Sequence, residues 1–159
     1  IWCEKYLAIN YVHKYCMQKN VDKKDSVKII EPVNLYGCTL EDNVFVGPFV
    51  EIQSDVRIGC NTRVQSHSFI CSNVYIGEDC FVGHGVMFTN DKFEDRQLSK
   101  DFLPTRIGNK VYIGSNSTLL PIRICDDVVI GAGSVVTKDI TEPGTYIGNP
   151  ARKLKRNNA

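Results

Sequence analysis

An apolar residue at every sixth position is the feature that most constrains the fold of this chain. The period is unbroken between residues 40 and 88, and its members are Leu40, Val46, Ile52, Ile58, Val64, Ile70, Ile76, Val82 and Phe88. Because 43% of the residues are apolar, nine matches in one register would arise by chance only about once in two thousand trials. A six-residue period fits neither an α-helix nor a hairpin, so it indicates a repeat architecture.

A second column of residues supports the same period. Four positions after each apolar member lies a small or β-branched residue: Val44, Val50, Val56, Thr62, Ser68, Val74, Cys80 and Val86. We interpret each hexapeptide as one short strand and one turn, with three of them closing an 18-residue triangular coil. The large and the small residue of each hexapeptide are expected to point inward, while the turn residues face outward. The predicted fold is an all-β, parallel β-helix.

The period is interrupted once. It stops after Phe88 and resumes at Ile107, and its later members are Ile113, Leu119, Ile124, Ile130 and Val136. One hexapeptide accounts for six of the 19 residues from Phe88 to Ile107, so about thirteen residues are expected to protrude as a loop within 89–106. The step from Leu119 to Ile124 is one residue short, and Pro121 is expected to make a tighter corner there.

The N-terminal segment has a different pattern. Apolar residues at helical spacing (Trp2, Tyr6, Ile9, Val12 and Cys16) predict an amphipathic helix that covers the open end of the prism. We therefore divide the chain into a helix and linker (1–28), the β-helix domain (29–155) and a short tail (156–159). The first residue is Ile1 rather than Met, which favours the loss of a preceding segment.

Composition excludes several classes of protein. The net charge is +1 and the basic residues are scattered, so nucleic acid is not an expected partner. No run of eighteen apolar residues is present, so neither a membrane span nor a membrane partner is expected, and the protein is predicted to be cytoplasmic. The seven cysteines form no CxxC pair and lie mostly in apolar runs, as reduced buried thiols would.

The 18-residue coil predicts which turn residues stack. The corner that follows Val64, Val82, Ile113 and Ile130 carries Ser66, His84, Ser115 and Ala132 in one column and His67, Gly85, Asn116 and Gly133 in the next. Two of the three histidines share this corner, the run GAGSVV leaves its backbone amides open, and the next corner along the chain releases the loop. We interpret His84 as functional; the alternative is a turn residue that is satisfied by water.

Other motifs are missing. GAGSVV lacks the third glycine and the following helix of a dinucleotide fingerprint, and neither a GxSxG elbow nor a P-loop occurs. One of the three histidines, His13, lies in the predicted helix, so a three-imidazole zinc site is unlikely to form and no metal is expected.

The repeat, the interrupting loop, the segment VVIGAGSVVTKDI and the ending YIGNPARKLKR together resemble the left-handed β-helix acyltransferases, over residues 33–155. The left hand enters only through this resemblance, since a period of six does not fix it. The segment RVQSHSFICSNVYIGEDCFVGHGVMFTNDKF is most similar to the N-acetyltransferases that modify an amino group on a nucleotide-linked sugar.

The resemblance implies a homotrimer, with acetyl-CoA as the co-substrate in a groove between adjacent prisms. It assigns the pantetheine arm to the amides of Gly131, Ala132 and Gly133, and the adenine and phosphates to Lys138, Pro150 and Arg152. Ser115 and Asn116 are expected beside the cofactor, where a backbone amide of their turn is our candidate oxyanion donor. His84 matches the catalytic histidine, while Asn90 and Asp91, with His67, are expected to contact the acceptor sugar.

Thioester aminolysis explains the histidine. An acceptor ammonium must lose a proton before it attacks, and an imidazole, with an ordinary pKa near 6.5, accepts one at neutral pH. The sequence therefore predicts an acetyl-CoA-dependent N-acetyltransferase for a UDP- or dTDP-linked amino sugar, with His84 as general base. Two alternatives stay open: an O-acetyltransferase of the same fold, and a non-catalytic solenoid that serves assembly.

Overall fold

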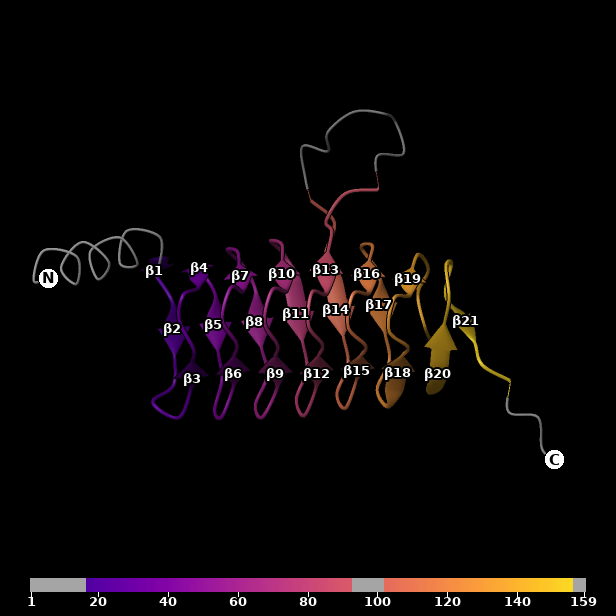
Figure 1. Cartoon of the computed structure of the whole chain (residues 1–159), viewed down its shortest axis with the longest axis horizontal. Coiled ribbons are helices and arrows are strands. Elements are labelled where there is room, and N and C mark those ends of the chain that lie inside the picture. Colours follow the sequence, from indigo (N-terminus) through magenta and orange to yellow (C-terminus); the bar gives the residue numbers. More distant parts are fainter. Residues whose placement is uncertain (1–16, 93–101, 156–159) are drawn as a thin grey trace, which may run out of the picture.

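The computed structural model describes residues 17–92 and 102–155, which form three parallel β-sheets around one core (Figure 1). Sheet A contains β1 (Met17–Lys19), β4 (Asn34–Tyr36), β7 (Glu51–Ile52), β10 (Phe69–Ile70), β13 (Met87–Phe88), β16 (Thr118–Leu119) and β19 (Val135–Val136). Sheet B contains β2 (Asp22–Lys23), β5 (Thr39–Leu40), β8 (Arg57–Ile58), β11 (Val74–Ile76), β14 (Thr105–Ile107) and β17 (Arg123–Ile124). Sheet C contains β3 (Lys28–Ile29), β6 (Phe45–Val46), β9 (Arg63–Val64), β12 (Phe81–Val82), β15 (Tyr112–Ile113), β18 (Val128–Ile130), β20 (Gly144–Ile147) and β21 (Arg152–Lys153).

The chain visits the three sheets in turn, so each strand pairs with the strand one coil earlier and one coil later. Phe45, Arg63 and Phe81 are register partners on neighbouring strands of sheet C, and they are 18 residues apart in sequence. Neighbouring coils are therefore about 4.8 Å apart. The prediction of an 18-residue triangular coil is confirmed, and sheet A with its seven strands gives the number of coils as about seven.

The core consists of the two predicted columns. Every large residue of the six-residue period is at most 5% exposed, and Phe88 is fully buried. The small column includes five buried hydroxyls (Thr62, Ser68, Thr105, Ser117 and Ser134), and four of them are hydrogen-bonded, whereas Thr105 Oγ1 has no partner among the described residues. Thr62 Oγ1, for example, donates to Gly77 C=O (2.8 Å) and accepts the N–H of Cys80 (3.0 Å). A buried hydroxyl that is satisfied in this way does not carry the desolvation penalty of an unpaired one.

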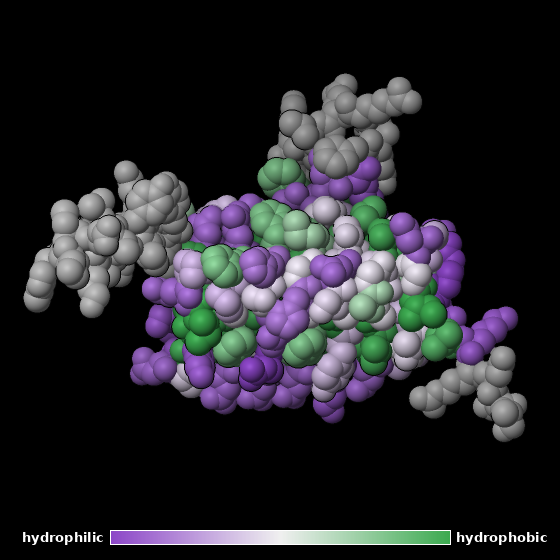
Figure 2. Space-filling view, in the orientation of Figure 1, coloured by the Kyte–Doolittle hydropathy of each residue, from purple (hydrophilic) through white to green (hydrophobic). Residues whose placement is uncertain are grey.

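The turns lie at three corners, and most of them contain one residue with positive φ. At the corner between sheets B and C these residues are Asn43, Asn61, Asp79, Lys110 and Asp127. Asn and Asp tolerate this conformation better than other side chains, and here Asn61 also donates to Asp79 Oδ1 one coil away (3.0 Å). Figure 2 shows a hydrophilic band along the lower edge of the solenoid, where this corner lies, whereas polar and apolar residues are interspersed on the rest of the visible face.

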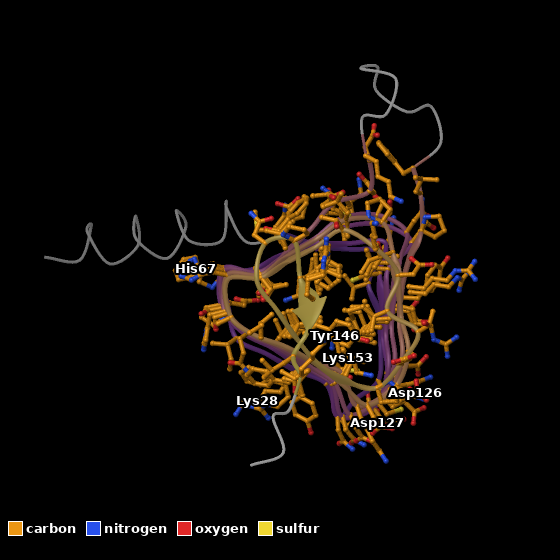
Figure 3. All side chains as sticks on the ribbon, turned by 90° about the vertical axis from the view of Figure 1, so that its right-hand side faces the viewer. Lys28, His67, Asp126, Asp127, Tyr146 and Lys153 are labelled. Carbon is orange, nitrogen blue, oxygen red and sulfur yellow. The ribbon has the colours of Figure 1, made fainter. Side chains whose placement is uncertain are left out.

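The coil is left-handed. Figure 3 views the solenoid from its C-terminal end, with the His67 corner on the left, the Asp126–Asp127 corner at lower right and Lys28 of sheet C between them at the bottom. The chain runs clockwise from the His67 corner through sheets A and B to Asp126 and returns through sheet C, while it advances toward the viewer. Clockwise advance toward the viewer defines a left-handed helix, so the hand implied by the resemblance is confirmed.

The solenoid begins earlier than the sequence predicts. β1, β2 and the first residue of β3 lie in the segment 17–28, which the sequence analysis assigned to the helix and linker. The three strands form the first coil of the solenoid. This coil has no preceding neighbour within the described residues, so much of it is exposed and its sequence is polar; Val21 and Val27 alone continue the small column upstream of Val33. The predicted N-terminal helix falls mainly on residues 1–16, outside the described residues.

The register identifies both irregular coils. Val74 pairs with Thr105, 31 residues later instead of 18, so thirteen residues are inserted at this point. The insertion leaves from the corner between sheets A and B, the next corner after His84, and residues 93–101 of it lie outside the described ranges. The five-residue step is also confirmed, because Arg106 pairs with Arg123, 17 residues later, and buried Pro121 occupies the short corner.

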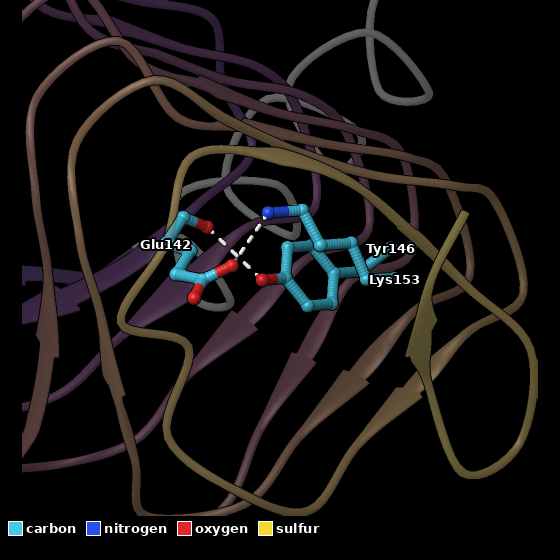
Figure 4. Close-up of polar contacts among 3 residues, drawn as sticks. All are labelled: Glu142, Tyr146 and Lys153. Carbon is cyan, nitrogen blue, oxygen red and sulfur yellow. Dashed lines mark hydrogen bonds and ion pairs between the residues drawn. The ribbon is translucent and has the colours of Figure 1, made fainter. Parts of the chain in front are cut away.

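The C-terminal end is closed by a hairpin. β20 continues sheet C, and β21 turns back on it in antiparallel register, with Tyr146 opposite Lys153. Figure 4 shows both side chains meeting Glu142: Tyr146 donates its hydroxyl to Glu142 C=O (3.0 Å), and Lys153 Nζ lies 2.8 Å from Glu142 Oε2. The tail from residue 156 onward lies outside the described residues.

The five cysteines in the described residues are free thiols, in agreement with the prediction of a reduced chain. Burial raises the pKa of Cys38 and of Cys71 to about 11. These two cysteines fill the core and are not expected to act as nucleophiles or metal ligands.

Candidate functional site

The corner between sheets C and A stacks the turns that the sequence placed together. Its positive-φ positions are Phe49, His67, Gly85, Asn116 and Gly133, one in each successive coil. Backbone hydrogen bonds join these coils: Gly85 N–H donates to Ser66 C=O (3.0 Å), Asn116 N–H to His84 C=O (2.8 Å) and Gly133 N–H to Ser115 C=O (2.8 Å). The corner is therefore a continuous ladder, and the predicted alignment of His84 with Ser66, Ser115 and Ala132 is confirmed.

His84 is held on both sides by serines of neighbouring coils. Its ring Nδ1 lies 2.8 Å from Ser66 Oγ, and its backbone N–H donates to Ser115 Oγ (3.2 Å). The side chain is nevertheless exposed. When Ser66 accepts the proton of Nδ1, the tautomer is fixed and the lone pair of Nε2 is left to accept a proton from a ligand.

Buried Ser68 fixes the turn that carries His84. Its Oγ donates to Gly83 C=O (2.8 Å) and accepts the N–H of Val86 (3.2 Å), so one hydroxyl joins both ends of the turn. Ser68 is only 1% exposed, and its bonds cannot be replaced by bonds to water without opening the core. The turn is therefore rigid at the position where the imidazole needs to be oriented.

Of the two glycines beside His84, Gly83 is required by close packing and Gly85 by its backbone conformation. A Cβ on Gly83 would lie 2.7 Å from Ser115 N, and a Cβ on Gly85 would lie 2.6 Å from Asn116 Oδ1. Gly85 also has a φ of +64°, which costs free energy for any other residue. The motif GHG thus allows the next coil to approach His84 closely.

His67 lies one coil before His84 and does not contact it through any bond found in the described residues. It has a φ of +63° and stacks on Phe49, with ring centroids 4.8 Å apart and an interplanar angle of 15°. Figure 3 shows His67 at the outer tip of the corner, pointing away from the prism. The aromatic pair is a feature of this site that the sequence analysis missed.

The residues expected beside the cofactor follow His84 along the same corner. Ser115 and Asn116 lie one coil later, and Gly131, Ala132 and Gly133 lie two coils later. No atom lies within 4 Å of the Cβ position of Gly133, so the backbone there is open. Asn116 N–H already donates to His84 C=O; within this turn the N–H of Ser115 is therefore the better oxyanion donor.

Lys138 and Arg152 lie near each other at the C-terminal end. Both line a cavity of about 290 Å³, together with Thr137, Tyr146 and Lys153. Pro150 is exposed and lies two residues before Arg152. This end thus offers several cations to an anionic ligand, although Lys153 is engaged by Glu142, whose carboxylate raises the pKa of Lys153.

Asn90 and Asp91 do not converge on His84 within one chain. They lie at the corner between sheets A and B, and β13 separates them from the His84 turn. Asp91 is buried, with 8% of its surface exposed, and Asn90 C=O accepts the N–H of Leu103 at the base of the loop (3.0 Å). Within one chain, His84 and this pair of residues thus lie on different corners of the prism.

Residues 17–92 and 102–155 contain neither a metal-site cluster nor a membrane-spanning helix. No cluster of three or more histidine, cysteine or acidic side chains has the arrangement that holds a metal ion. No helix in these ranges is long and apolar enough to cross a membrane.

Two sequence families match this chain. Residues 55–90 match the family described as bacterial transferase hexapeptide (six repeats), and residues 104–138 match the hexapeptide repeat of succinyl-transferase. Among curated proteins, the bifunctional protein GlmU of Streptococcus uberis is 35% identical over 120 residues, which are 75% of this chain and 24% of GlmU. The chain spans only about a quarter of the length of that relative.

Solved structures show the same fold. A hexapeptide transferase family protein from Anaplasma phagocytophilum has a TM-score of 0.73 at 15% identity, covering 85% of this chain and 78% of that chain. A mutant of AntD, an N-acyltransferase from Bacillus cereus in complex with dTDP and coenzyme A, has a TM-score of 0.68 at 17% identity, covering 92% and 87%. A mutant of perosamine N-acetyltransferase from Caulobacter crescentus, in complex with CoA and GDP-perosamine, has a TM-score of 0.62 at 20% identity, covering 96% and 63%. The resemblance to the hexapeptide-repeat β-helix acyltransferases is confirmed in both repeat and fold.

Proposed function

We propose that this chain, a hexapeptide-repeat protein with the left-handed β-helix of the acyltransferases, is an acetyl-CoA-dependent N-acetyltransferase. Its acceptor is the amino group of a UDP- or dTDP-linked amino sugar. The observation that carries the proposal is His84 on a corner where Ser66 holds its Nδ1 at 2.8 Å. Similar folds with CoA and a nucleotide or nucleotide sugar bound support the substrate class.

The chemistry follows from the order of residues along the corner. The turn Gly131–Gly133, whose backbone is open at Gly133, takes the pantetheine arm, and Lys138 and Arg152 beyond it take the anionic end of acetyl-CoA. This places the thioester toward Ser115 and His84. Acetyl-CoA supplies the acetyl unit. The chain supplies the base and the oxyanion donor, and it aligns the amine with the thioester.

His84 Nε2 removes a proton from the acceptor ammonium as the amine attacks the thioester carbonyl. The C–N bond forms, the C–S bond breaks, and the negative charge on the carbonyl oxygen is met by the N–H of Ser115. The imidazolium then returns its proton to the sulfur of the departing CoA, and the second proton that the nitrogen loses on becoming an amide is released to solvent, so protons and charges balance. Ser66 is a neutral partner for His84, which suits an amine acceptor because an amine needs a weaker base than a hydroxyl does.

The proposed site draws on more than one copy of the chain. Asn90 and Asp91, with the loop they begin, leave from a different corner than His84. In a cyclic homotrimer, the loop corner of one prism faces the His84 corner of the next, and each site takes its base from one copy and its acceptor contacts from another.

Acetyl transfer to UDP- and dTDP-linked amino sugars, compared with the matching hydroxy sugars, tests the proposal. We expect transfer to the amino sugars only, together with stabilisation by CoA of about 2.7 kcal/mol at one hundred times its dissociation constant. Transfer to the hydroxy sugars alone would instead support an O-acetyltransferase. A chain that CoA does not stabilise at all would be a non-catalytic solenoid.

A further inference from the structure

An open groove lies on the His84 corner, two coils toward the N-terminus. It has a volume of about 290 Å³ and is lined by Pro32, Val33, Asn34, Phe49, Val50 and Glu51. Phe49, His67 and Gly85 occupy the same turn position in three successive coils. At 4.8 Å per coil, Phe49 lies about 10 Å from the His84 turn. None of these groove residues takes part in the reaction described above.

Phe49 is unusual in two ways. Its side chain is 58% exposed, and its backbone has a φ of +59°. A bulky residue at positive φ is a rare and costly choice where asparagine or glycine would fit. The ring is supported from one side by His67, stacked at 4.8 Å, and Phe49 lines the groove. Such a ring offers a planar platform to a flat ligand.

The lining of the groove is mainly apolar, and Glu51 adds one negative charge to it. The Glu51 carboxylate accepts hydrogen bonds from Asn34 Nδ2 (3.0 Å) and Gln53 Nε2 (3.1 Å), which fix its position. Asn34 Oδ1 is buried and has no hydrogen-bond partner among the described residues. The Glu51 carboxylate favours a ligand that donates O–H or N–H bonds, and it disfavours a phosphate.

We propose that this groove binds the nucleoside end of the acceptor, with the base stacked on Phe49 and the ribose and base donors directed to Glu51. The inference rests on the proposed function and adds to it the position of the nucleoside. The diphosphate then runs away from Glu51, past His67, and the sugar amine reaches His84. Phe69 and Met87, which follow Glu51 in register on sheet A, give this path an apolar wall.

Binding of nucleoside diphosphates to Phe49→Ala tests the proposal without reliance on turnover. Titration calorimetry of the full chain with uridine 5′-diphosphate and thymidine 5′-diphosphate is expected to show affinity reduced roughly 5- to 100-fold for the better ligand, the usual loss for one base–aromatic stack. Pyrophosphate and CoA should bind the variant as they bind the parent. Phe49→Tyr keeps the ring and should restore affinity.

Tyr75→Ala is the matched control, because Tyr75 is an exposed aromatic on sheet B, away from this corner. It should leave nucleotide affinity unchanged. Equal affinity of the parent and Phe49→Ala, or no nucleoside diphosphate binding by the parent, would overturn the proposal. The proposal would also be overturned if Phe49→Ala kept its affinity for nucleoside diphosphates but changed its mass in light scattering. That result would show that Phe49 packs against another copy of the chain. Because CoA binding and acetyl transfer are measured separately, failure here is distinguishable from failure of the proposed function.

Discussion

At the scale of the residue, the site depends on serines that would be unremarkable in a solenoid turn. Ser66 and Ser115 hold the ring and the backbone of His84, and Ser68 joins both ends of its turn. Ser66 and Ser68 belong to the coil before His84, and Ser115 belongs to the coil after it. The position of the imidazole is therefore fixed by the stacking of coils rather than by its own loop.

Ser66→Ala tests this positioning. Loss of one hydrogen bond of ordinary strength is expected to lower kcat about 2- to 12-fold, because the imidazole keeps its chemistry but loses its fixed tautomer. The affinity for CoA should not change, and Ser66→Thr should recover most of the rate. A kcat for Ser66→Ala equal to that of the parent would show that the 2.8 Å contact does not orient His84.

Thiol labelling tests the burial of the core cysteines. Because the pKa of Cys38 and of Cys71 is about 11, only about one molecule in a thousand carries either thiolate at pH 8, and burial blocks the reagent as well. Iodoacetamide at pH 8 should leave both unmodified in the folded protein and modify both in urea, as read by mass spectrometry. Rapid modification under native conditions would contradict the packing described here.

At the scale of the element, the inserted loop is independent of the coil that it interrupts. Leu103 N–H donates to Asn90 C=O (3.0 Å), and Thr105 N–H donates to Asn73 C=O (3.0 Å), so the base of the loop is closed by backbone bonds. The two strands that flank it, β13 and β14, pair with their neighbouring coils as the other strands do.

Replacement of residues 93–101 by two glycines should therefore leave the solenoid folded, because a shorter loop changes the closure entropy only slightly. The melting temperature is expected to stay within a few degrees of the parent, while acetyl transfer to the amino sugar is lost and CoA binding is kept. A variant that still turns over at the parental rate would show that the loop has no part in acceptor binding.

At the scale of the whole molecule, the proposal predicts an assembly with a mass of three times 17.9 kDa, about 54 kDa, in light scattering. It also predicts complementation. When His84→Ala chains are mixed with chains that lack residues 93–101 and the two are refolded together, about one quarter of the sites in random trimers combine an intact histidine with an intact loop. Recovered activity near that fraction supports a shared site, whereas two inactive parents that stay inactive after mixing would exclude it.

Much of this molecule could be predicted from its sequence, because a six-residue period leaves few alternatives. The buried columns, the 18-residue stacking of Ser66 on His84 and the thirteen-residue insertion all followed from counting. The first coil was missed because Gln18 and Lys23 occupy the positions that Leu35 and Leu40 fill one coil later, so that only Ile29 continues the large column. Phe49 was missed because an exposed aromatic in a turn has no periodic signal.

The central claim is that His84 is the base for acetyl transfer, and the kcat of His84→Ala measures it most directly. We expect kcat to fall by roughly 10² to 10⁴, equivalent to about 2.7 to 5.5 kcal/mol of transition-state stabilisation. The dissociation constant for CoA and the melting temperature should hardly change, since the side chain is exposed and the cofactor rests on backbone amides farther along the corner. A kcat that is unchanged at every pH and with every amino sugar would contradict the account, and His84 would then be only a turn residue of the scaffold.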